Sequence, residues 1–497
     1  MPSQSPPLIS FASRIQQWAA AHPEKTALIF VPESGTHQHF SWQWLDTYTN
    51  QLAHFFAQKG IDDESHIVIG LINCPEHIFV AVAAWKLGAM VVPIRNATPP
   101  HERDQILALA DPKLVVTDWV DIPYPTLTPE DLNQVNNFPT DPLPDIIAFP
   151  GKAMTSGGST GRPKLIVDTE PWGREEGWPV FDALKLMPSM VQLVAGALYH
   201  TAPFSWAHMG LYQDQTLILT AHFDPIQVVE LIEQYQVEYA YMAPIMMSRI
   251  AKLPEVKRYD LSSMTCLIHT AAPCPPWLKR TWFDLIGAEH VLELYAATEA
   301  GVATVIWGDE WLAHPNSVGR AAATHELRIL DAEGEISPTG EVGEIFMRRL
   351  DQETTEFSYV GSPPAKMVDG FASVGDLGWL DEDGYLYIAD RRVDMIITGG
   401  ANVFPAEVEA VLTEHPAIGD VAVIGLRDEE WGKRVHAVIQ PRDEFNLPSL
   451  SELDTHCRAR LMAYKVPKTY DFVAQLPRSS AGKIRRSALI AEREPPS

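Results

Sequence analysis

Two patterns of apolar residues alternate between residues 10 and 118, and this alternation restricts the fold more than any other feature. Residues 41–60 carry apolar side chains at helical spacing, whereas residues 66–72 form an apolar run of strand length. Helices that alternate with buried strands are typical of a parallel sheet covered by helices, so an α/β fold is predicted here. The same patterns then recur, helical at 75–87 and strand-like at 90–94 and 113–117.

The rest of the chain falls into four further regions. Residues 121–150 contain seven prolines and little periodicity, so they are expected to form a connecting segment. A second α/β stretch is predicted over residues 190–290. Residues 325–390 contain short apolar runs separated by turn signals, which predicts a small β-rich unit. After Asp394 the pattern restarts with strands and two helices, which predicts a small α+β domain.

A glycine-rich stretch, Thr155-Ser-Gly-Gly-Ser-Thr-Gly-Arg-Pro-Lys164, follows the connecting segment. Accessible backbone amides, hydroxyl donors and positive charge in one loop suit a polyphosphate, so nucleotide binding is favoured over a polar surface linker. The stretch is not the common P-loop, because proline precedes Lys164 and two apolar residues follow it. Since Pro163 restricts Arg162 to extended conformations, a strand is predicted to begin here.

Composition limits the class of partner. The chain has 38 Lys and Arg against 64 Asp and Glu, a formal charge of -26, which disfavours nucleic acid and anionic membranes. Its 4 cysteines show no metal-ligand spacing and are too few for a disulfide framework. The N-terminus lacks a signal-peptide pattern, and we find no run of 18 apolar residues. A cytoplasmic protein with small-molecule partners, no nucleic acid and no stable membrane insertion is therefore expected. The oligomeric state stays open, with a homodimer as one option.

Five further segments follow the glycine-rich stretch. They are Tyr199-His200-Thr-Ala-Pro-Phe204, Leu294-Tyr-Ala-Ala-Thr-Glu299, Val374-Gly-Asp-Leu-Gly378, Asp390-Arg-Arg-Val-Asp-Met-Ile-Ile-Thr-Gly-Gly-Ala-Asn-Val403 and Arg478-Ser-Ser-Ala-Gly-Lys-Ile484. In this order, and together with the glycine-rich stretch, they resemble the adenylate-forming superfamily over residues 10–490. This superfamily comprises acyl- and aryl-CoA synthetases, luciferases and peptide-synthetase adenylation domains. Within it the chain is similar to bacterial acyl-CoA ligases of the bile-acid and aryl type, and also to stand-alone amide bond synthetases.

The resemblance implies that the protein activates a carboxylic acid with ATP to an acyl-adenylate, releases pyrophosphate, and transfers the acyl group to CoA. ATP and Mg²⁺ are the implied cofactors, with CoA as the second substrate. The main alternative is an amide bond synthetase, in which an amine replaces the thiol, and the motifs do not separate the two. A luciferase-type oxygenase stays open, whereas a catalytically dead scaffold and a peptide-synthetase module are disfavoured. An aromatic or bulky hydrophobic acid is expected from Phe204, Trp206, Met209, Tyr241 and Met242.

The resemblance also assigns roles to individual residues. Lys483 is expected to stabilise the transition state between the carboxylate and the α-phosphate, both of which are anions. Glu299 is expected to hold Mg²⁺, Thr298 to bond the α-phosphate, and His200 to line or gate the acyl pocket. The nucleotide phosphates are assigned to the glycine-rich stretch, with Thr155, Ser156, Gly157, Gly158, Ser159, Thr160, Gly161 and Lys164 as its binding residues.

Further roles concern the adenosine, the CoA arm and a hinge. Tyr295 is expected to stack on adenine, while Asp376 and Arg391 bind the ribose. Gly399 and Gly400 are expected to let a pantetheine arm pass close to the backbone. A hinge at residues 391–394 is expected to separate a large N-terminal domain, residues 1–391, of α/β subdomains plus the β-rich unit, from a smaller mobile C-terminal domain, residues 392–497.

Two positions depart from the family pattern. Ala296 stands where the family usually has glycine, which puts the range of acids in doubt more than their activation. Val393 stands where the family usually has a hinge aspartate or lysine, so the rotation is expected to be tuned differently.

Overall fold

A computed structural model describes residues 7–157, 163–350, 358–364, 366–391, 394–398, 401–443, 445–478 and 483–494. The chain divides into two compact units. The first comprises Met1–Met242, Lys252–Ile268 and Glu356–Pro364, and the second comprises Ala243–Ala251, His269–Thr355 and Ala365–Ser497. This division does not test the domain boundary expected at residues 391–392, which stays a prediction. Within the described ranges, no helix is both long enough and apolar enough to cross a membrane.

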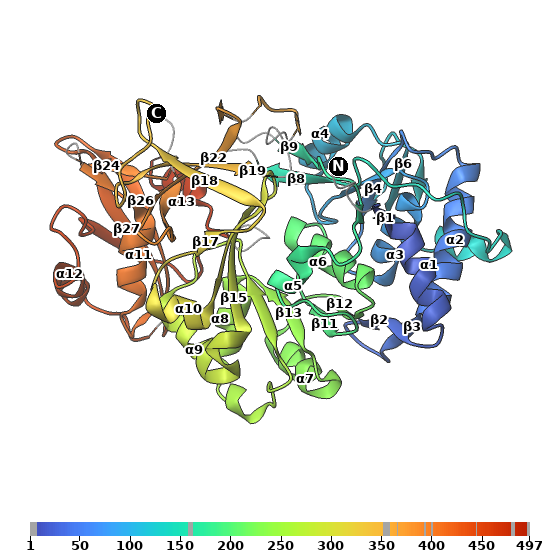
Figure 1. The fold of residues 1–497 in the computed structure, drawn as a ribbon. Helices are drawn as coiled ribbons and strands as arrows, with labels where there is room; N and C mark the ends of the chain where they lie inside the picture. Colours follow the sequence, from blue (N-terminus) through green and yellow to red (C-terminus); the bar gives the residue numbers. More distant parts are fainter. Residues whose placement is uncertain are drawn as a thin grey trace. The chain divides into compact units, whose positions relative to one another are not determined.

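The α/β pattern expected at the start of the chain is confirmed. Four strands lie in the order β5-β4-β6-β7, and all of them pair in parallel. Helix α2 begins after Ser41, whose hydroxyl accepts a hydrogen bond from the backbone N–H of Trp44. It packs against both α1 and α3 at the right of Figure 1. The bounds are α1 (Phe11–Ala21), α2 (Trp42–Gln58), β4 (His66–Gly70), α3 (Pro75–Trp85), β5 (Met90–Pro93), α4 (Pro100–Ala110), β6 (Leu114–Thr117) and β7 (Thr126–Leu127).

A second sheet of the first unit contains strands in the order β14-β13-β11-β12-β2-β3. Strands β13, β11, β12 and β2 pair in parallel, and β3 pairs antiparallel with β2. The expected α/β stretch from residue 190 is therefore confirmed. The bounds are β1 (Ile9–Ser10), β2 (Thr26–Val31), β3 (Gln38–Ser41), β10 (Gly173–Arg174), α5 (Pro179–Ala183), β11 (Val191–Val194), α6 (Thr201–Tyr212), β12 (Thr216–Thr220), α7 (Pro225–Tyr235), β13 (Tyr239–Met242), η2 (Val256–Arg258) and β14 (Cys266–His269).

The two ends of the glycine-rich stretch lie on neighbouring antiparallel strands of the first unit. Strand β8 (Ala153–Gly157) pairs antiparallel with β9 (Pro163–Val167), so the strand predicted to follow Arg162 is confirmed. A third strand from a distant part of the sequence, β20 (Ser358–Val360), pairs antiparallel with the other edge of β9. The connecting segment before the hairpin contains β7 and one 3-10 helix, η1 (Asp131–Asn137).

The second unit contains most of the β-rich region expected over residues 325–390, and β20 within this range belongs to the first unit. Strands β18, β19, β22 and β21 form an antiparallel sheet, with β23 also paired to β22, while β15, β16 and β17 pair antiparallel with one another. The bounds are α8 (Pro244–Ala251), α9 (Pro276–Ile286), η3 (Ala288–His290), β15 (Val291–Ala297), β16 (Gly301–Trp307), α10 (Gly308–Ala313), β17 (Arg320–Ala321), β18 (His325–Leu330), β19 (Gly343–Arg349), β21 (Lys366–Val368), β22 (Phe371–Leu380) and β23 (Leu386–Arg391).

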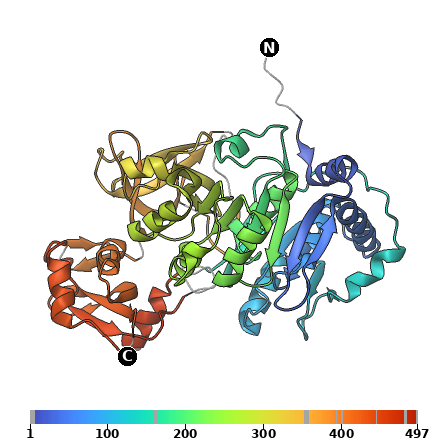
Figure 2. The same cartoon turned by 90° about the horizontal axis from the view of Figure 1, so that it is seen from below.

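The C-terminal part of the second unit has the expected mixture of strands and helices. Strands β26 and β27 form a long antiparallel hairpin, and β28 adds to β27 in parallel (orange to red in Figures 1 and 2). Helices α11 and α12 cover an apolar core that includes Val408, Leu412 and Leu453. The bounds are β24 (Ile396–Thr398), β25 (Ala401–Val403), α11 (Pro405–Thr413), β26 (Ile418–Asp428), β27 (Gly432–Pro441), α12 (Leu450–Arg458), β28 (Thr469–Phe472) and α13 (Arg486–Arg493).

Candidate active site

In the first unit, the two ends of the glycine-rich stretch lie on the paired strands β8 and β9. Ser156 lies opposite Lys164 across the β8–β9 ladder, and Thr155 lies opposite Leu165. Lys164 is half-buried, and its ammonium lies 3.6 Å from the centroid of the Tyr359 ring on β20. The ladder continues to Gly157, whereas Gly158, Ser159, Thr160 and Gly161 lie outside the described residues.

His200 lies at the start of helix α6 in the same unit. It is half-buried, its backbone carbonyl accepts the N–H of Phe204 at 3.0 Å, and its ring lies 4.4 Å from that of Tyr199. The turn before it is held by the buried side chain of Asn73. The Asn73 amide donates to the carbonyls of Gly196 at 2.9 Å and Thr220 at 3.1 Å, while its oxygen accepts the N–H of Leu198 at 2.9 Å. Asn73 therefore fixes the backbone that leads to His200.

Helix α6 rests on an aromatic core. Phe204 is completely buried, with its ring 5.9 Å from that of Trp85 and 4.3 Å from that of His208. Burial lowers the pKa of His208 to about 3, and burial also lowers the pKa of His77 to about 3. Both imidazoles are therefore neutral at pH 7, and they belong to the core under α6.

In the second unit, two segments expected to bind the nucleotide contact each other. The hydroxyl of Tyr295 on β15 donates to Oδ2 of Asp376 on β22 at 2.7 Å. Ala296, at the position where the family usually has glycine, lies at an irregularity in the register between β15 and β16. Thr298 and Glu299 lie in the turn directly after β15, and both are half-buried.

Strands β22 and β23 bring the two residues expected at the ribose into register. Asp376 lies opposite Arg391 across this ladder, and Asp376 is buried. Gly375 before it has a φ of +84°, a conformation that favours glycine, and its N–H donates to the Ser373 hydroxyl at 3.0 Å. Gly399 and Gly400, which are expected at the CoA arm, lie outside the described residues.

Lys483 is exposed, and the segments on both sides of it are held by ion pairs. Residues Arg478 and Ile484 form an antiparallel bridge, and the N–H of Arg485 donates to the Pro477 carbonyl at 2.9 Å. Arg478 donates to Oδ2 of Asp420, from Nη2 at 2.5 Å and from Nε at 3.2 Å. The base of the loop that carries Lys483 is thus fixed on the sheet of the C-terminal part.

Arg486 holds the other end of this loop. Its Nη2 donates to both carboxylate oxygens of Glu409, at 2.6 and 2.9 Å, and its Nε donates to the Val423 carbonyl at 3.2 Å. Its Nη1 also lies 3.5 Å from Oδ2 of Asp394, within the expected hinge. Burial raises the pKa of Glu409, and the positive charge of Arg486 opposes that rise. One guanidinium therefore links the Lys483 loop, helix α11 and the hinge segment.

The described residues contain no group of three or more His, Cys, Asp or Glu side chains that could hold a metal ion. Mg²⁺ usually binds one or two carboxylates together with substrate phosphates and water. Glu299, in the turn after β15, is half-buried and could supply one such carboxylate.

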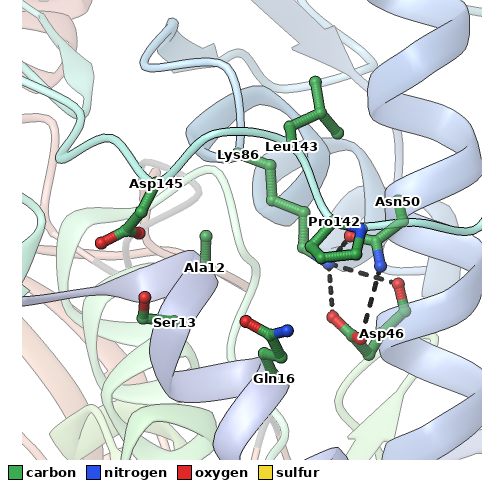
Figure 3. Close-up of a pocket in the computed structure, with 9 residues that line it drawn as sticks. All are labelled: Ala12, Ser13, Gln16, Asp46, Asn50, Lys86, Pro142, Leu143 and Asp145. Carbon is green, nitrogen blue, oxygen red and sulfur yellow. Dashed lines mark hydrogen bonds and ion pairs between the residues drawn. The ribbon is translucent and has the colours of Figure 1, made fainter.

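A small polar pocket in the first unit is a different kind of site (Figure 3). Its volume is about 30 Å³, enough for roughly one or two water molecules. Lys86 points into it, and its ammonium donates to Oδ1 of Asp46 at 2.6 Å and to Oδ1 of Asn50 at 2.5 Å. Burial lowers the pKa of Lys86, and the Asp46 carboxylate opposes this. The pocket therefore encloses a structural ion pair.

Two family models match the chain. The AMP-binding enzyme model matches residues 15–351, and the model of the AMP-binding enzyme C-terminal domain matches residues 407–483. The chain belongs to the AMP-binding enzyme family. Its superfamily and fold class are therefore as expected, and it is an enzyme of the AMP-forming ligase class.

Similar proteins extend over most of the chain. A feruloyl-CoA synthase from an Amycolatopsis species is 34% identical, over 83% of this chain and 85% of the relative. A 2-succinylbenzoate–CoA ligase from Bacillus licheniformis is 29% identical, over 97% of this chain and 100% of the relative. The structure of o-succinylbenzoate CoA synthetase from Bacillus subtilis with its acyl-adenylate intermediate has a TM-score of 0.81 at 25% identity, covering 96% of this chain and 97% of that one.

Three groups of contacts around the candidate residues are not apparent from the sequence. Tyr359 beside Lys164, Asn73 before His200, and the Arg486–Glu409 pair beside Lys483 all join residues that are distant in sequence. None of them carries a local pattern that would have identified its partner. One signal in the sequence could have drawn attention to Arg486, since it lies three residues after Lys483.

Proposed function

We propose that this enzyme joins a carboxylic acid to CoA in two steps. In the first, a carboxylate oxygen attacks the α-phosphorus of ATP, which forms an acyl-adenylate and releases pyrophosphate. In the second, the CoA thiol attacks the acyl carbon, the thiol proton is lost, and AMP leaves. The observation that carries the proposal is the contact between Tyr295 and Asp376, because it joins two expected nucleotide-binding segments beside the Thr298–Glu299 turn.

The chemistry of the first step requires positive charge, because two anions must approach each other. Lys483 supplies this charge in the proposal, and its exposed position on an anchored loop supports that role. The glycine-rich hairpin, with Lys164 at its base, binds the phosphates through backbone amides, hydroxyls and one ammonium. Thr298 donates a hydrogen bond to the α-phosphate. At the ribose, Asp376 accepts hydrogen bonds from the hydroxyls and Arg391 donates to them. Bound at Glu299, Mg²⁺ would neutralise phosphate charge.

The relatives support the second step and the choice of acid. Both curated relatives described above are named as CoA ligases, which supports CoA as acceptor. Their names contain feruloyl and succinylbenzoate groups, which supports an aromatic acid. The side chains expected near the acyl group, Tyr241 and Met209 among them, are large and largely buried, consistent with a bulky apolar substrate. An amide bond synthetase of known structure has a TM-score of 0.82 but only 24% identity, so it supports the fold alone.

A product assay tests the proposal directly. The protein is incubated with ATP, Mg²⁺ and a panel of aryl, fatty and steroid-like acids, with CoA or with simple amines, and the products are identified by mass spectrometry. We expect an aryl-CoA thioester and AMP, formed only when CoA is present. Efficient amide formation without CoA, together with no thioester when CoA is present, would show that the acceptor is an amine and not CoA. Thioesters formed from fatty acids and from no aryl acid would overturn the choice of acid.

A further inference from the structure

The side chain of Asn73 connects two sheets of the first unit. It lies three residues after β4, and only 6% of the residue is exposed. Its amide nitrogen donates to the carbonyl of Gly196, two residues after β11, and to that of Thr220, the last residue of β12. Because β11 and β12 pair in parallel, both carbonyls lie at the carboxyl ends of neighbouring strands. Ligands of open α/β sheets usually bind outside this edge.

Two of the three hydrogen bonds of Asn73 hold the turn between β11 and α6. The nitrogen bonds the Gly196 carbonyl at 2.9 Å, and the oxygen accepts the N–H of Leu198, also at 2.9 Å. The turn continues to His200, whose N–H donates to the Ala197 carbonyl at 3.1 Å. An apolar side chain in place of this buried amide would leave the backbone groups of the turn without their partner.

The other side of this turn contacts residues that are expected around the acid. A Cβ placed on Gly196 would lie 2.7 Å from Cγ of Pro203, in the first turn of α6, and 3.8 Å from Cε1 of Tyr241 on β13. The backbone at Gly196 is therefore packed tightly between Asn73 and these two side chains. His200, at the end of the same turn, and Tyr241 are both expected near the acyl group, so the turn joins two parts of the expected pocket.

We propose that Asn73 is a positioning residue for the acid, holding the turn from Gly196 to His200 against Tyr241 before the acid binds. The inference rests on the proposed function, because it assumes that His200 and Tyr241 line the acyl pocket. Asn73 acts through the turn and needs no contact with the acid. A wall that is fixed in advance reduces the ordering cost of binding, and a displacement of about 1 Å can cost on the order of 100-fold in rate.

Substitutions on both sides of the turn test the inference. We expect Asn73→Leu to raise the KM for the acid about 5- to 20-fold in pyrophosphate exchange, with the KM for ATP within about 2-fold of the wild type. Benzoate and ferulate serve as the probe acids. Gly196→Ala should give the same selective rise, because its backbone conformation accepts a side chain and the contact with Pro203 then forces the turn to move.

A matched control lies on α2 in the same unit. Gln51 is also a buried amide, and its nitrogen donates to the carbonyls of Asn136 at 3.1 Å and Phe138 at 3.2 Å. Gln51→Leu removes two comparable hydrogen bonds and should leave both KM values unchanged. Thermal melts of the two leucine variants separate a loss of folding from a loss of positioning. If Asn73→Leu fails to fold, Gly196→Ala decides, because it keeps the Asn73 amide.

His200→Ala separates this inference from the proposed function. If the wild type shows no exchange with either probe acid or with any other aryl acid, the proposed choice of acid fails and the inference fails with it. If His200→Ala leaves the KM for the acid unchanged, the assigned pocket fails, and again the inference with it. If His200→Ala raises that KM but Asn73→Leu raises neither KM, or raises both equally, the pocket stands and the positioning role of Asn73 is overturned.

Discussion

The two lysines expected to face ATP are held in opposite ways. Lys164 is half-buried on a strand, with paired strands on both sides and an aromatic ring over its ammonium. Lys483 is exposed, and ion pairs of Arg478 and Arg486 hold the segments on both sides of it. The sheet can fix Lys164 before the substrate arrives, whereas Lys483 takes its position from the anchored segments on either side of it. The difference suggests that Lys164 serves binding and Lys483 serves the chemical step.

The largest expected effect comes from Lys483→Ala. Removing the charge that stabilises the transition state should reduce the rate of adenylation about 100- to 1000-fold, with little change in the KM for ATP. Transfer from a preformed acyl-adenylate to CoA should continue, since that step does not bring the carboxylate to the α-phosphate. The measurements are pyrophosphate exchange for the first step and single-turnover transfer for the second.

Arg485→Ala is the control for this prediction, because it removes an exposed cation two residues away on the same segment. It should leave both steps within about 2-fold of the wild type. Full-turnover activity that survives Lys483→Ala would show that Lys483 has no part in adenylation, and the contrast between the two lysines would disappear.

Lys164→Met should have a smaller effect of a different kind. Loss of one hydrogen-bonding charge against a phosphate is expected to weaken ATP binding about 10- to 30-fold. The adenylation rate at saturating ATP should fall less than with Lys483→Ala. Equilibrium titration with a non-hydrolysable ATP analogue measures the binding loss, and Lys152→Met serves as a control lysine paired with Asp168 in the same unit. If Lys164→Met lowered the adenylation rate at saturating ATP but left binding of the ATP analogue unchanged, the roles assigned to the two lysines would be reversed.

The sequence predicted the strand that carries Lys164, because strand patterns are local. The strand after Arg162 followed from one proline, just as the helix over residues 75–87 followed from apolar spacing. The ring beside Lys164 and the anchors on either side of Lys483 could not be predicted in this way. Strand β20 has only 3 residues, and no local pattern pairs it with β9. The contact of Tyr295 with Asp376 likewise depends on how β15 and β22 pack.

The roles of the individual residues have a different basis. They came from motif order and resemblance, and the substitutions described here are what test them. Ala296 illustrates the limit, because the sequence shows a departure from glycine, but only the structure shows that it lies at an irregular point between β15 and β16. What an extra methyl group does to the range of acids depends on the shape around it, and sequence spacing carries no such information.

A smaller effect is expected when the anchor of the Lys483 loop is weakened. Arg486→Lys keeps the charge but cannot reproduce the fork of bonds to Glu409 and Val423. We expect a loss of about 1 to 2 kcal/mol in the unfolding free energy of this part of the chain and a roughly 3- to 10-fold lower adenylation rate. Arg458→Lys is the control, because its exposed pair with Asp454 should contribute under about 1 kcal/mol. An unchanged adenylation rate would mean that the anchor does not position Lys483.

The smallest expected effect is a pH dependence of this anchor. Burial raises the pKa of Glu409 above its usual 4.5, and Arg486 opposes the rise. The folded protein therefore binds this proton more readily than the unfolded chain, so the contribution of Glu409 to stability is present below pH 4.5 and is lost as the pH rises through the folded pKa. Relative to Glu409→Gln, the wild type should gain unfolding free energy as the pH falls from 7 towards 4.5, as measured by denaturant titration.

Glu452 in the same part of the chain gives the opposite sign and so provides an internal control. Hydrogen bonds from the backbone N–H and hydroxyl of Ser449 lower the pKa of this exposed carboxylate below 4.5. Its contribution is present above pH 4.5 and is lost as the pH falls through the folded pKa, so the wild type should lose stability relative to Glu452→Gln. Both glutamates report on the same part of the chain. If the pH-dependent stability differences of the two Gln variants from the wild type had the same sign, Glu409 would not be buried as described. The anchored loop that distinguishes Lys483 from Lys164 would then lose its support.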